Sequence, residues 1–385
     1  VDDVSFPPLS VTMGGVVDQM ENVSKSDDSG NRKLVKKDDF VINSRSDRKG
    51  SSGISPRDGS VSLINIVLKP KNINPKYSEY LFKSYYFKEE FFRNGRGIHF
   101  DLWSTRYESM KQIFIPYPKI EEQEEIVSYL DKKINQIDVL IDQIERKIEL
   151  FKEQRTSIIN EVVTKGLNPD VEMKDSGVEW IGEIPSHWDI LPLKYFGKVT
   201  LGKMLTSEDQ GGYILKPYLR STNIQKERVD VSDVNEMWFS VSELEKLRLL
   251  KGDLLFNEGG DVGRTCIWLN ELDECYIQNS VNRVRLEKDN EWFFLYLSSL
   301  YHSVGHYDSI VNRVSFPHLT KEKLESVIFL KPPISEQQQI VEYLDEQIQK
   351  TDKRILNEEK KVELLKEYKK SLISEVVLGK KKVVS

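Results

Sequence analysis

Residues 121–131 read Glu-Glu-Gln-Glu-Glu-Ile-Val-Ser-Tyr-Leu-Asp, and residues 335–345 read Ser-Glu-Gln-Gln-Gln-Ile-Val-Glu-Tyr-Leu-Asp. The two stretches match without a gap at an offset of 214 residues. The same offset aligns Lys-Asp-Asp-Phe-Val-Ile-Asn at 37–43 with Lys-Gly-Asp-Leu-Leu-Phe-Asn at 251–257. A repeat of this period indicates two copies of one structural unit. Each copy consists of a globular part followed by a long charged part.

Apolar residues recur along both charged parts at steps of three and four, a period near 3.5 that is typical of a coiled coil. The two matching seams are Ile126, Leu130, Ile134, Ile137, Ile141, Ile144, Ile148 and Phe151, and Ile340, Leu344, Ile348, Thr351, Ile355, Glu358, Val362 and Leu365. Polar Thr351 and Glu358 interrupt the second seam, where such residues cost stability but fix register. Prolines precede both helices, which we expect at 121–164 and 335–378. The first helix would be about 66 Å long at 1.5 Å per residue.

Two similar helices in one chain can pair with each other. The globular part between them must carry the chain back, so the pair would be antiparallel; a dimerisation stalk is the alternative. Within the globular parts, residues 61–68 and 280–286 are rich in β-branched residues and predict strands, whereas 78–92 and 291–301 predict aromatic-rich helices. The predicted fold class is α+β: two α/β domains separated by a long antiparallel two-helix coiled coil, with a pseudo-twofold internal repeat.

Length and composition restrict the class of protein. The chain has 385 residues, of which 31% are charged, and a net charge of −6. At roughly 150 residues per domain it should form two or three domains. The longest apolar run, near 292–297, is far shorter than the roughly 18 residues of a membrane helix, so we expect no membrane association. Two cysteines and the lack of a signal-like N-terminus favour a cytoplasmic location.

The sequence contains no recognisable catalytic motif. Phosphate-binding, dinucleotide-binding and nucleophile-elbow glycine patterns are missing. Cys266 and Cys275 lack a second cysteine pair, and His302 and His306 lack a third ligand, so we expect no metal site. Nothing in the sequence motifs argues for an enzyme, and an enzymatic function stays open at this point of the reasoning.

Polar, glycine-bearing loops follow the two matching strands. Arginine, lysine, serine and asparagine are the side chains that read base edges and hold phosphates. Between 31 and 57, eight lysines and arginines face three aspartates. An ordinary solvated loop and, for Arg264, an intramolecular ion pair are the alternatives. The candidate DNA-binding residues are Ser44, Arg45, Arg48 and Lys49 in the first loop, and Asn257, Glu258, Asp261 and Arg264 in the second.

Residues 175–188, Asp-Ser-Gly-Val-Glu-Trp-Ile-Gly-Glu-Ile-Pro-Ser-His-Trp, closely resemble a motif of the specificity subunits of bacterial type I restriction–modification systems. Residues 113–126, Ile-Phe-Ile-Pro-Tyr-Pro-Lys-Ile-Glu-Glu-Gln-Glu-Glu-Ile, and 328–340, Ile-Phe-Leu-Lys-Pro-Pro-Ile-Ser-Glu-Gln-Gln-Gln-Ile, resemble the start of that family's two central helices. Residues 102–106, Leu-Trp-Ser-Thr-Arg, resemble the end of a recognition domain. The motifs stand in the family's order and span the chain.

The resemblance implies a protein that is not an enzyme and has no catalytic residues and no bound cofactor of its own. Its two target-recognition domains would each read half of a split, asymmetric sequence in double-stranded DNA. The paired helices would set the spacing between the half-sites and dock two modification subunits, which bind S-adenosylmethionine and methylate adenine. Restriction subunits could join and supply ATP-dependent cleavage. Trp180 and Trp188 are candidates for partner docking, and packing of the linker onto the helices is the alternative for both.

The implied order is a first recognition domain, a helix, a linker, a second recognition domain and a second helix, at 1–116, 117–166, 167–189, 190–331 and 332–380. Nothing like 175–188 precedes the first unit. Matching 9–11 to 219–221 leads us to expect that roughly 35 residues of the first domain are absent, an N-terminal truncation. A coiled-coil adaptor without a DNA role and an inactive truncated specificity cassette remain alternatives.

Overall fold

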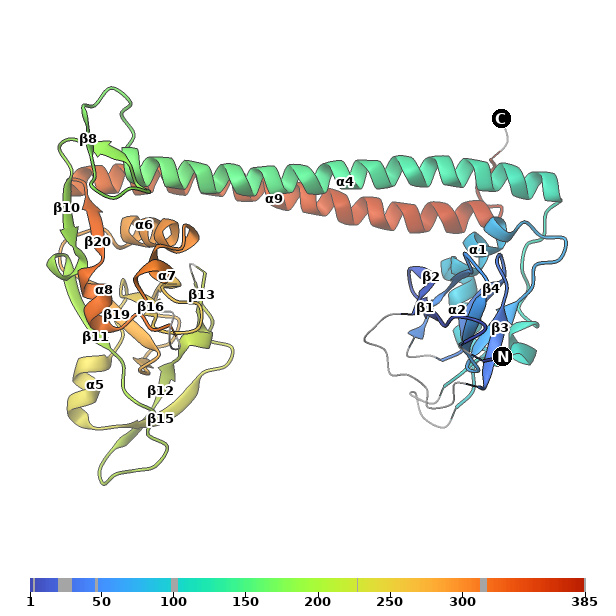
Figure 1. The fold of residues 1–385 in the computed structure, drawn as a ribbon, viewed down its shortest axis with the longest axis horizontal. Helices are drawn as coiled ribbons and strands as arrows, with labels where there is room; N and C mark the ends of the chain where they lie inside the picture. The colour runs from blue at the N-terminus through green and yellow to red at the C-terminus, as the bar shows by residue number, and fades with distance from the viewer. Residues whose placement is uncertain are drawn as a thin grey trace. The chain divides into compact units, whose positions relative to one another are not determined.

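The computed structural model describes residues 1–2, 4–19, 30–45, 48–97, 103–226, 228–311 and 317–383. Ser46 and Asp47 of the first predicted loop, and Leu102 of the 102–106 motif, lie outside the described residues. Contacts divide the chain into two compact units: unit 1 is Val1–Ile148 with Leu356–Ser385, and unit 2 is Glu149–Ile355. The long helices α4 (Ile120–Lys165) and α9 (Ile334–Val377), drawn in Figure 1, each contribute one part to unit 1 and the other part to unit 2.

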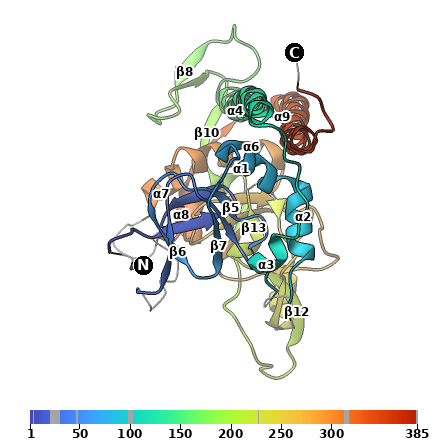
Figure 2. The ribbon, with the colours of Figure 1, turned by 90° about the vertical axis from the view of Figure 1, so that its right-hand side faces the viewer.

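Within each unit the parts of α4 and α9 lie side by side, as the end-on view in Figure 2 shows, and the contacts between them show that they run antiparallel. In unit 1, Lys369 Nζ lies 2.6 Å from Asp138 and Lys366 Nζ lies 3.1 Å from Glu145. In unit 2, Arg155 Nε lies 3.5 Å from Asp352. The predicted antiparallel pairing is therefore confirmed. Most seam residues are buried, namely Ile126, Leu130, Ile137, Ile141, Ile144, Ile148, Ile340, Leu344, Thr351, Glu358 and Val362.

Unit 1 combines small antiparallel sheets with short helices. Strand β1 (Leu9–Thr12) pairs with β2 (Gly15–Asp18), and β3 (Arg32–Val35) pairs with β6 (Gly59–Ser62). A three-stranded sheet has the order β5 (Ser52–Ile54), β4 (Phe40–Asn43), β7 (Asn65–Leu68). Helices α1 (Pro75–Lys83), α2 (Tyr85–Arg93) and α3 (Tyr107–Met110) follow. Phe40 and Ile42 of β4 pack with Phe87 and Phe91 of α2.

Unit 2 contains a larger set of sheets. The hairpin β8 (Met173–Asp175) and β9 (Glu183–Pro185) follows α4, and β10 (Asp189–Pro192) pairs with β20 (Ile328–Lys331). A four-stranded sheet has the order β11 (Gly197–Leu201), β19 (Val281–Leu286), β16 (Leu254–Asn257), β17 (Thr265–Ile267). A second sheet has the order β15 (Asn235–Phe239), β12 (Ile214–Leu219), β18 (Tyr276–Ile277), and β13 (Ile224–Gln225) pairs with β14 (Arg228–Val229). The helices are α5 (Val241–Leu247), α6 (Glu291–Ser303), α7 (His306–Ile310) and α8 (Lys321–Ser326).

The repeat is visible in the central strands. Strand β4 lies between β5 and β7 as β16 lies between β17 and β19. The turn before each strand needs a positive φ, which Asp38 (69°) and Gly252 (92°) provide at matching positions. The next residue is a buried aspartate in both copies, and its carboxylate accepts a backbone N–H three residues earlier at 2.8 Å. The aligned motif therefore encodes the same turn and strand twice.

Two sequence-based element predictions were wrong in detail. The strand expected at 61–68 is the end of β6 and all of β7, joined by a turn at Leu63 and Ile64. The helix expected at 78–92 is two helices separated by Ser84, whose extended backbone (ψ 153°) ends α1 and whose hydroxyl accepts from Phe87 N at 3.3 Å. A serine at an N-cap favours such a break because its hydroxyl accepts from a backbone N–H of the first turn, which has no carbonyl partner within the helix. The strand and helix expected at 280–286 and 291–301 are present as β19 and α6.

A buried glutamine joins each globular part to its helix. In unit 1, Gln123 Nε2 donates to Pro118 O at 2.8 Å, and its Oε1 accepts from Asn74 N at 2.8 Å. In unit 2, Gln337 makes the matching bonds to Pro332 O (3.0 Å) and Asn290 N (2.9 Å). Asn74 and Asn290 are the N-cap residues of α1 and α6. This glutamine clamp fixes the start of a globular helix to the first turn of a long helix in both units.

Within the described part of the chain, no helix combines the length and apolar composition needed to cross a bilayer.

The clamp gives a stability prediction. Gln337→Met keeps the side chain's approximate length but leaves the Asn290 N–H and the Pro332 carbonyl without this partner. Unsatisfied buried groups of this kind cost about 1–3 kcal/mol each, so we expect a loss of that order in the free energy of unfolding. Gln339→Met, at an exposed position of the same helix, is the matched control for chemical denaturation. Equal stability of the two variants would show that the clamp contributes nothing.

The buried seam carboxylate gives a pH prediction. Glu358 lies 2.9 Å from Lys147 Nζ and 3.0 Å from Lys361 Nζ. The hydrogen bond from Lys147, and to a smaller extent the one from Lys361, lowers the pKa of Glu358 below its usual value of 4.5. A lowered pKa stabilises the folded state above the usual value, and this stability is lost as pH falls through the folded-state pKa. Glu358→Gln should therefore be less stable than the parent at pH 7, and the difference should shrink below about pH 4.

Urea unfolding of both proteins across that pH range measures the effect, with exposed Glu359→Gln as the control. A stability difference that does not change with pH would rule out the ionised pair as its source.

Candidate nucleic-acid interface

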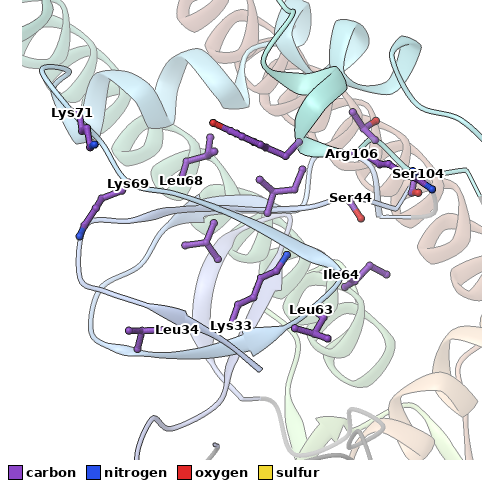
Figure 3. A pocket seen from close by; sticks show the side chains of 14 residues that line it. Lys33, Leu34, Ser44, Leu63, Ile64, Leu68, Lys69, Lys71, Ser104 and Arg106 are labelled. Atoms are coloured by element: carbon purple, nitrogen blue, oxygen red, sulfur yellow. The ribbon is translucent and has the colours of Figure 1, made fainter. Parts of the chain in front are cut away.

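A basic hollow of about 900 Å³ lies in unit 1. Its lining comes from strands β3 and β7, the residue after β4, and the segment 104–107. Figure 3 shows Lys69 and Lys71 at one end, Ser44, Ser104 and Arg106 at the other, and Lys33 between them. The lining is Lys33, Leu34, Ser44, Leu63, Ile64, Ile66, Val67, Leu68, Lys69, Lys71, Ser104, Thr105, Arg106 and Tyr107, which includes four cationic residues and no carboxylate.

The cations of the hollow are available to an anionic ligand. Lys69, Lys71 and Arg106 are exposed, and none of them forms an ion pair within the described part of the chain. Lys33 Nζ donates to Asn65 O at 2.6 Å, which leaves its charge unneutralised. Ammonium and guanidinium groups without protein counter-ions suit phosphate oxygens, whose binding supplies most of the affinity for a nucleic acid.

The first predicted loop borders this hollow. Ser44 lines it, and exposed Arg45 forms a β-bridge with Ser104, another lining residue. Arg48 is exposed, and its carbonyl accepts from Ser51 N at 2.9 Å. Lys49 instead turns toward α2, where its Nζ lies 2.8 Å from Glu89 and 4.5 Å from the centre of the Phe92 ring. Arg45 therefore lies beside the cations that line the hollow, whereas Lys49 already forms an ion pair with Glu89.

The second predicted loop is held by bonds within unit 2. Asn257 is fully buried, and its amide oxygen, when turned toward Arg264, accepts from Nε at 3.3 Å and Nη2 at 3.1 Å. Arg264 also donates to Ser221 O at 3.3 Å and lies 3.3 Å from the Asp261 carboxylate. The intramolecular ion pair considered as the alternative for Arg264 is therefore present. Arg264 would have to exchange these partners to reach a base, and its reading role stays a prediction.

The two acidic residues of this loop differ. Asp261 is exposed, and its carboxylate accepts a hydrogen bond from His302 Nε2 at 2.6 Å when that ring nitrogen carries the proton. Glu258 is half-buried, and burial raises its pKa. Its main chain is fixed by bonds to Ser280 O (2.9 Å) and from Leu319 N (2.7 Å). The carboxylates of Glu258 and Asp261 make this loop less favourable for phosphate contacts than the basic hollow of unit 1.

The two tryptophans proposed for docking pack inside unit 2. Trp188 is completely buried, and its ring centre lies 6.4 Å from that of Phe293. Trp180 is half-buried, edge-on to Tyr301 at 4.8 Å. Trp188 therefore presents no surface to a partner in this conformation. A docking role for the pair stays a prediction, and the contacts show that both hold the linker onto the second globular part.

Reasoning from sequence missed four basic residues of the hollow: Lys33, Lys69, Lys71 and Arg106. Lys33 belongs to the basic stretch 31–57, but nothing there separated it from its neighbours. Lys69 and Lys71 form a Lys-Pro-Lys sequence directly after a strand, a signal of the same kind as the one used for the loops.

The structure thus defines a modular protein with two repeated globular parts, each attached to paired antiparallel helices, and with a basic hollow in unit 1. A sequence model described as "Type I restriction modification DNA specificity domain" matches residues 11–150 and 185–364. The chain therefore belongs to the family of type I restriction–modification DNA specificity proteins. This membership confirms the predicted family and the prediction of a recognition subunit that is not itself an enzyme.

Individual relatives agree with this assignment. The type I restriction enzyme MjaVIII specificity subunit of Methanocaldococcus jannaschii is 26% identical over 310 residues, which cover 72% of this chain and 68% of the relative. The type I restriction enzyme EcoKI specificity subunit of Escherichia coli K12 is 25% identical over 246 residues, 62% of this chain and 51% of the relative.

Solved structures show the same fold. One, from work on complex assembly and conformational transition of the type I R-M system, has a TM-score of 0.68 at 15% identity and covers 91% of this chain and 84% of its own. The HsdS subunit of Thermoanaerobacter tengcongensis has a TM-score of 0.57 at 15% identity, with 90% and 82% covered. The α+β fold class with a long helix pair is thereby confirmed.

The hollow gives a binding prediction. Replacing both Lys69 and Lys71 by Ala should weaken duplex DNA binding at all sequences, since a bond to a phosphate carries no base information. The slope of log K against log salt should become shallower by about 0.9 for each phosphate that is no longer neutralised by the protein. Fluorescence anisotropy of a labelled duplex at several salt concentrations measures both quantities.

Lys360→Ala, which removes an exposed lysine on α9 in the same unit, is the control and should leave the slope unchanged. An unaltered slope in the double variant would show that DNA does not enter the hollow.

Proposed function

We propose that this chain recognises a bipartite target in double-stranded DNA, with one half read by each unit. The main support for the proposal is that the two globular parts share the same turn, central strand and attachment to a long helix but have different loops. Strands β4 and β16 follow the same turn, and both globular parts are clamped to a long helix through a buried glutamine. Because the first loop is basic and the second contains Glu258 and Asp261, the two half-sites should differ in sequence.

Within unit 1, the two kinds of DNA contact should come from different residues. Lys69, Lys71 and Arg106 in the hollow suit phosphates, since they are cations at the surface of a rigid sheet. Arg45 and Arg48, on the glycine-bearing loop beside it, suit base edges, where a bidentate arginine–guanine contact gives about 1–3 kcal/mol of discrimination. Affinity and specificity would then be separable by mutation.

The chain should act as one component of a restriction–modification complex. The exposed faces of α4 and α9 are the proposed docking surface for two modification subunits, which would bind S-adenosylmethionine, and restriction subunits would bind ATP. The helices would also set the spacer between the half-sites. A coiled-coil adaptor without a DNA role is disfavoured because it has no need for a carboxylate-free cluster of four cations.

Methylation mapping tests this proposal. When the chain is co-expressed with its modification subunits in a host that lacks other adenine methylation, methylated adenines should define a split motif with unequal halves. Arg264→Ala should relax one half only, whereas Arg45→Ala should relax the other. Removal of seven residues from both α4 and α9 should shorten the spacer and keep both halves. A single continuous motif, or a spacer that is unchanged by the deletion, would contradict the bipartite arrangement.

A further inference from the structure

A short hairpin packs against the central sheet of each unit, next to the loop that we predict to face DNA. In unit 2, β13 packs against β16 and β17 and β14 packs against β17, and loop 258–264 joins β16 to β17. In unit 1, β1 packs against β4 and β5 and β2 packs against β5, and loop 44–51 joins β4 to β5. Figure 1 shows β13 beside β16. The hairpin and the loop are therefore neighbours in both copies of the repeat.

The two hairpins also share a register. Each tip consists of a closing pair with two residues between its members, and the next pair inward is apolar and buried. The inward pairs pack with Leu255 of β16 and Val41 of β4, which occupy matching positions of the repeat. The inward pairs are Ile224–Val229 and Val11–Val16, and the closing pairs are Gln225–Arg228 and Thr12–Gly15. The hairpins therefore have one frame and chemically unlike tips.

The tip in unit 2 presents polar and cationic side chains to solvent. Because side chains alternate between the two faces of a strand, burial of the inward pair turns Gln225 and Arg228 away from the core. Lys226 and Arg228 are exposed, and neither forms an ion pair within the described part of the chain. Asp230 attracts Arg228 at longer range, but its carboxylate accepts from Ser232 N at 2.9 Å. Glu227, between the two cations in the sequence, lies outside the described residues.

Buried Asn223 fixes the base of this hairpin. Its side chain accepts from Arg220 N at 3.0 Å and donates to Asp230 O and Asp233 O at 2.9 Å each. Its main-chain carbonyl accepts from Asp230 N at 2.8 Å. Arg220 Nη2 in turn lies 2.5 Å from the Asp233 carboxylate. A tip held by such a base loses little conformational entropy when it binds a ligand.

Arg264 connects the hairpin to the predicted loop. Its Nη2 donates to Ser221 O at 3.3 Å, and Ser221 N donates to Ser280 Oγ at 3.1 Å. Arg264 is already engaged by Asn257 and Asp261, so it must give up partners before it can reach a base. Arg228 has no such partners to exchange and is the more available arginine on this surface.

We propose that the β13–β14 hairpin is the base-reading element of unit 2, an inference that rests on the proposed recognition of duplex DNA. The major groove of B-DNA admits a two-stranded ribbon. Arg228 makes a bidentate contact to a guanine, Gln225 beside it contacts an adjacent base edge, and Lys226 neutralises a phosphate. Arg264 holds the base of the hairpin through Ser221 and acts as a positioning residue.

The test uses the chain assembled with its modification subunits and maps methylated adenines. Arg228→Ala should relax one position in one half of the motif, with discrimination there falling at least about fivefold, while the other half keeps its strictness. Arg228→Lys should relax the same position, because lysine keeps the charge but lacks the planar fork. Lys226→Ala should keep the motif and make the salt slope of duplex binding shallower by about 0.9.

Lys251→Ala is the matched control. Lys251 is exposed in unit 2 and precedes β16, at the opposite end of that strand from loop 258–264, so its variant should change neither the motif nor the slope. Because Lys226 and Arg228 are exposed and form no ion pair among the described residues, all variants should unfold at the temperature of the parent.

Three outcomes would overturn the proposal: a motif as strict in Arg228→Ala as in the parent, full strictness in Arg228→Lys, or equal relaxation of both halves. The parent complex reports separately on the proposed function. A split motif from the parent that Arg228→Ala leaves unchanged removes the hairpin proposal alone, whereas a parent that does not bind duplex DNA removes both.

Discussion

Burial of the apolar seams is the constraint on which the structure depends. Charged residues occupy most of the remaining surface of α4 and α9. The apolar seam of either helix is therefore removed from water only when it packs against the apolar seam of the other helix. In each unit the two helix parts supply this partner seam to each other, and the contacts between Lys369 and Asp138 and between Arg155 and Asp352 follow from that pairing. The globular parts then need only an attachment point, which the glutamine clamp provides. Loop sequences can consequently change without disturbing the frame.

Local and periodic features were predictable from sequence, and features assembled from distant segments were not. The seams, the turn before β4 and β16, and α6 each depend on a continuous pattern. The break at Ser84 was missed because the aromatic residues on both sides favour one helix, whereas the serine's capping bond decides for two. The hollow was missed because Lys33, Lys69 and Arg106 come from three separate parts of the chain. Only the fold brings their charges together.

The two units differ in whether a positive charge at matching positions is neutralised within the protein or is free to attract a phosphate. Register along the central strands places Lys69 of unit 1 at the position of Arg285 in unit 2. Arg285 is held by Asp253 through two bonds of 2.7 Å, so its charge is neutralised within the protein. Lys69 is exposed, and no carboxylate lines the hollow around it. Two homologous positions with the same formal charge therefore offer very different attraction to a phosphate, a difference that composition does not reveal.

Unit 2 shows how the strand that leads into a long helix is covered. An exposed strand edge beside large apolar side chains favours uncontrolled pairing, and proteins usually cover it. In unit 2, β10 pairs with β20, and the buried ring of Trp188 packs near Phe293. Gln337 bonds to the carbonyl of Pro332, which directly follows β20. The covering strand, the covered strand and the first turn of α9 are therefore held together by main-chain pairing, one buried indole and one buried amide.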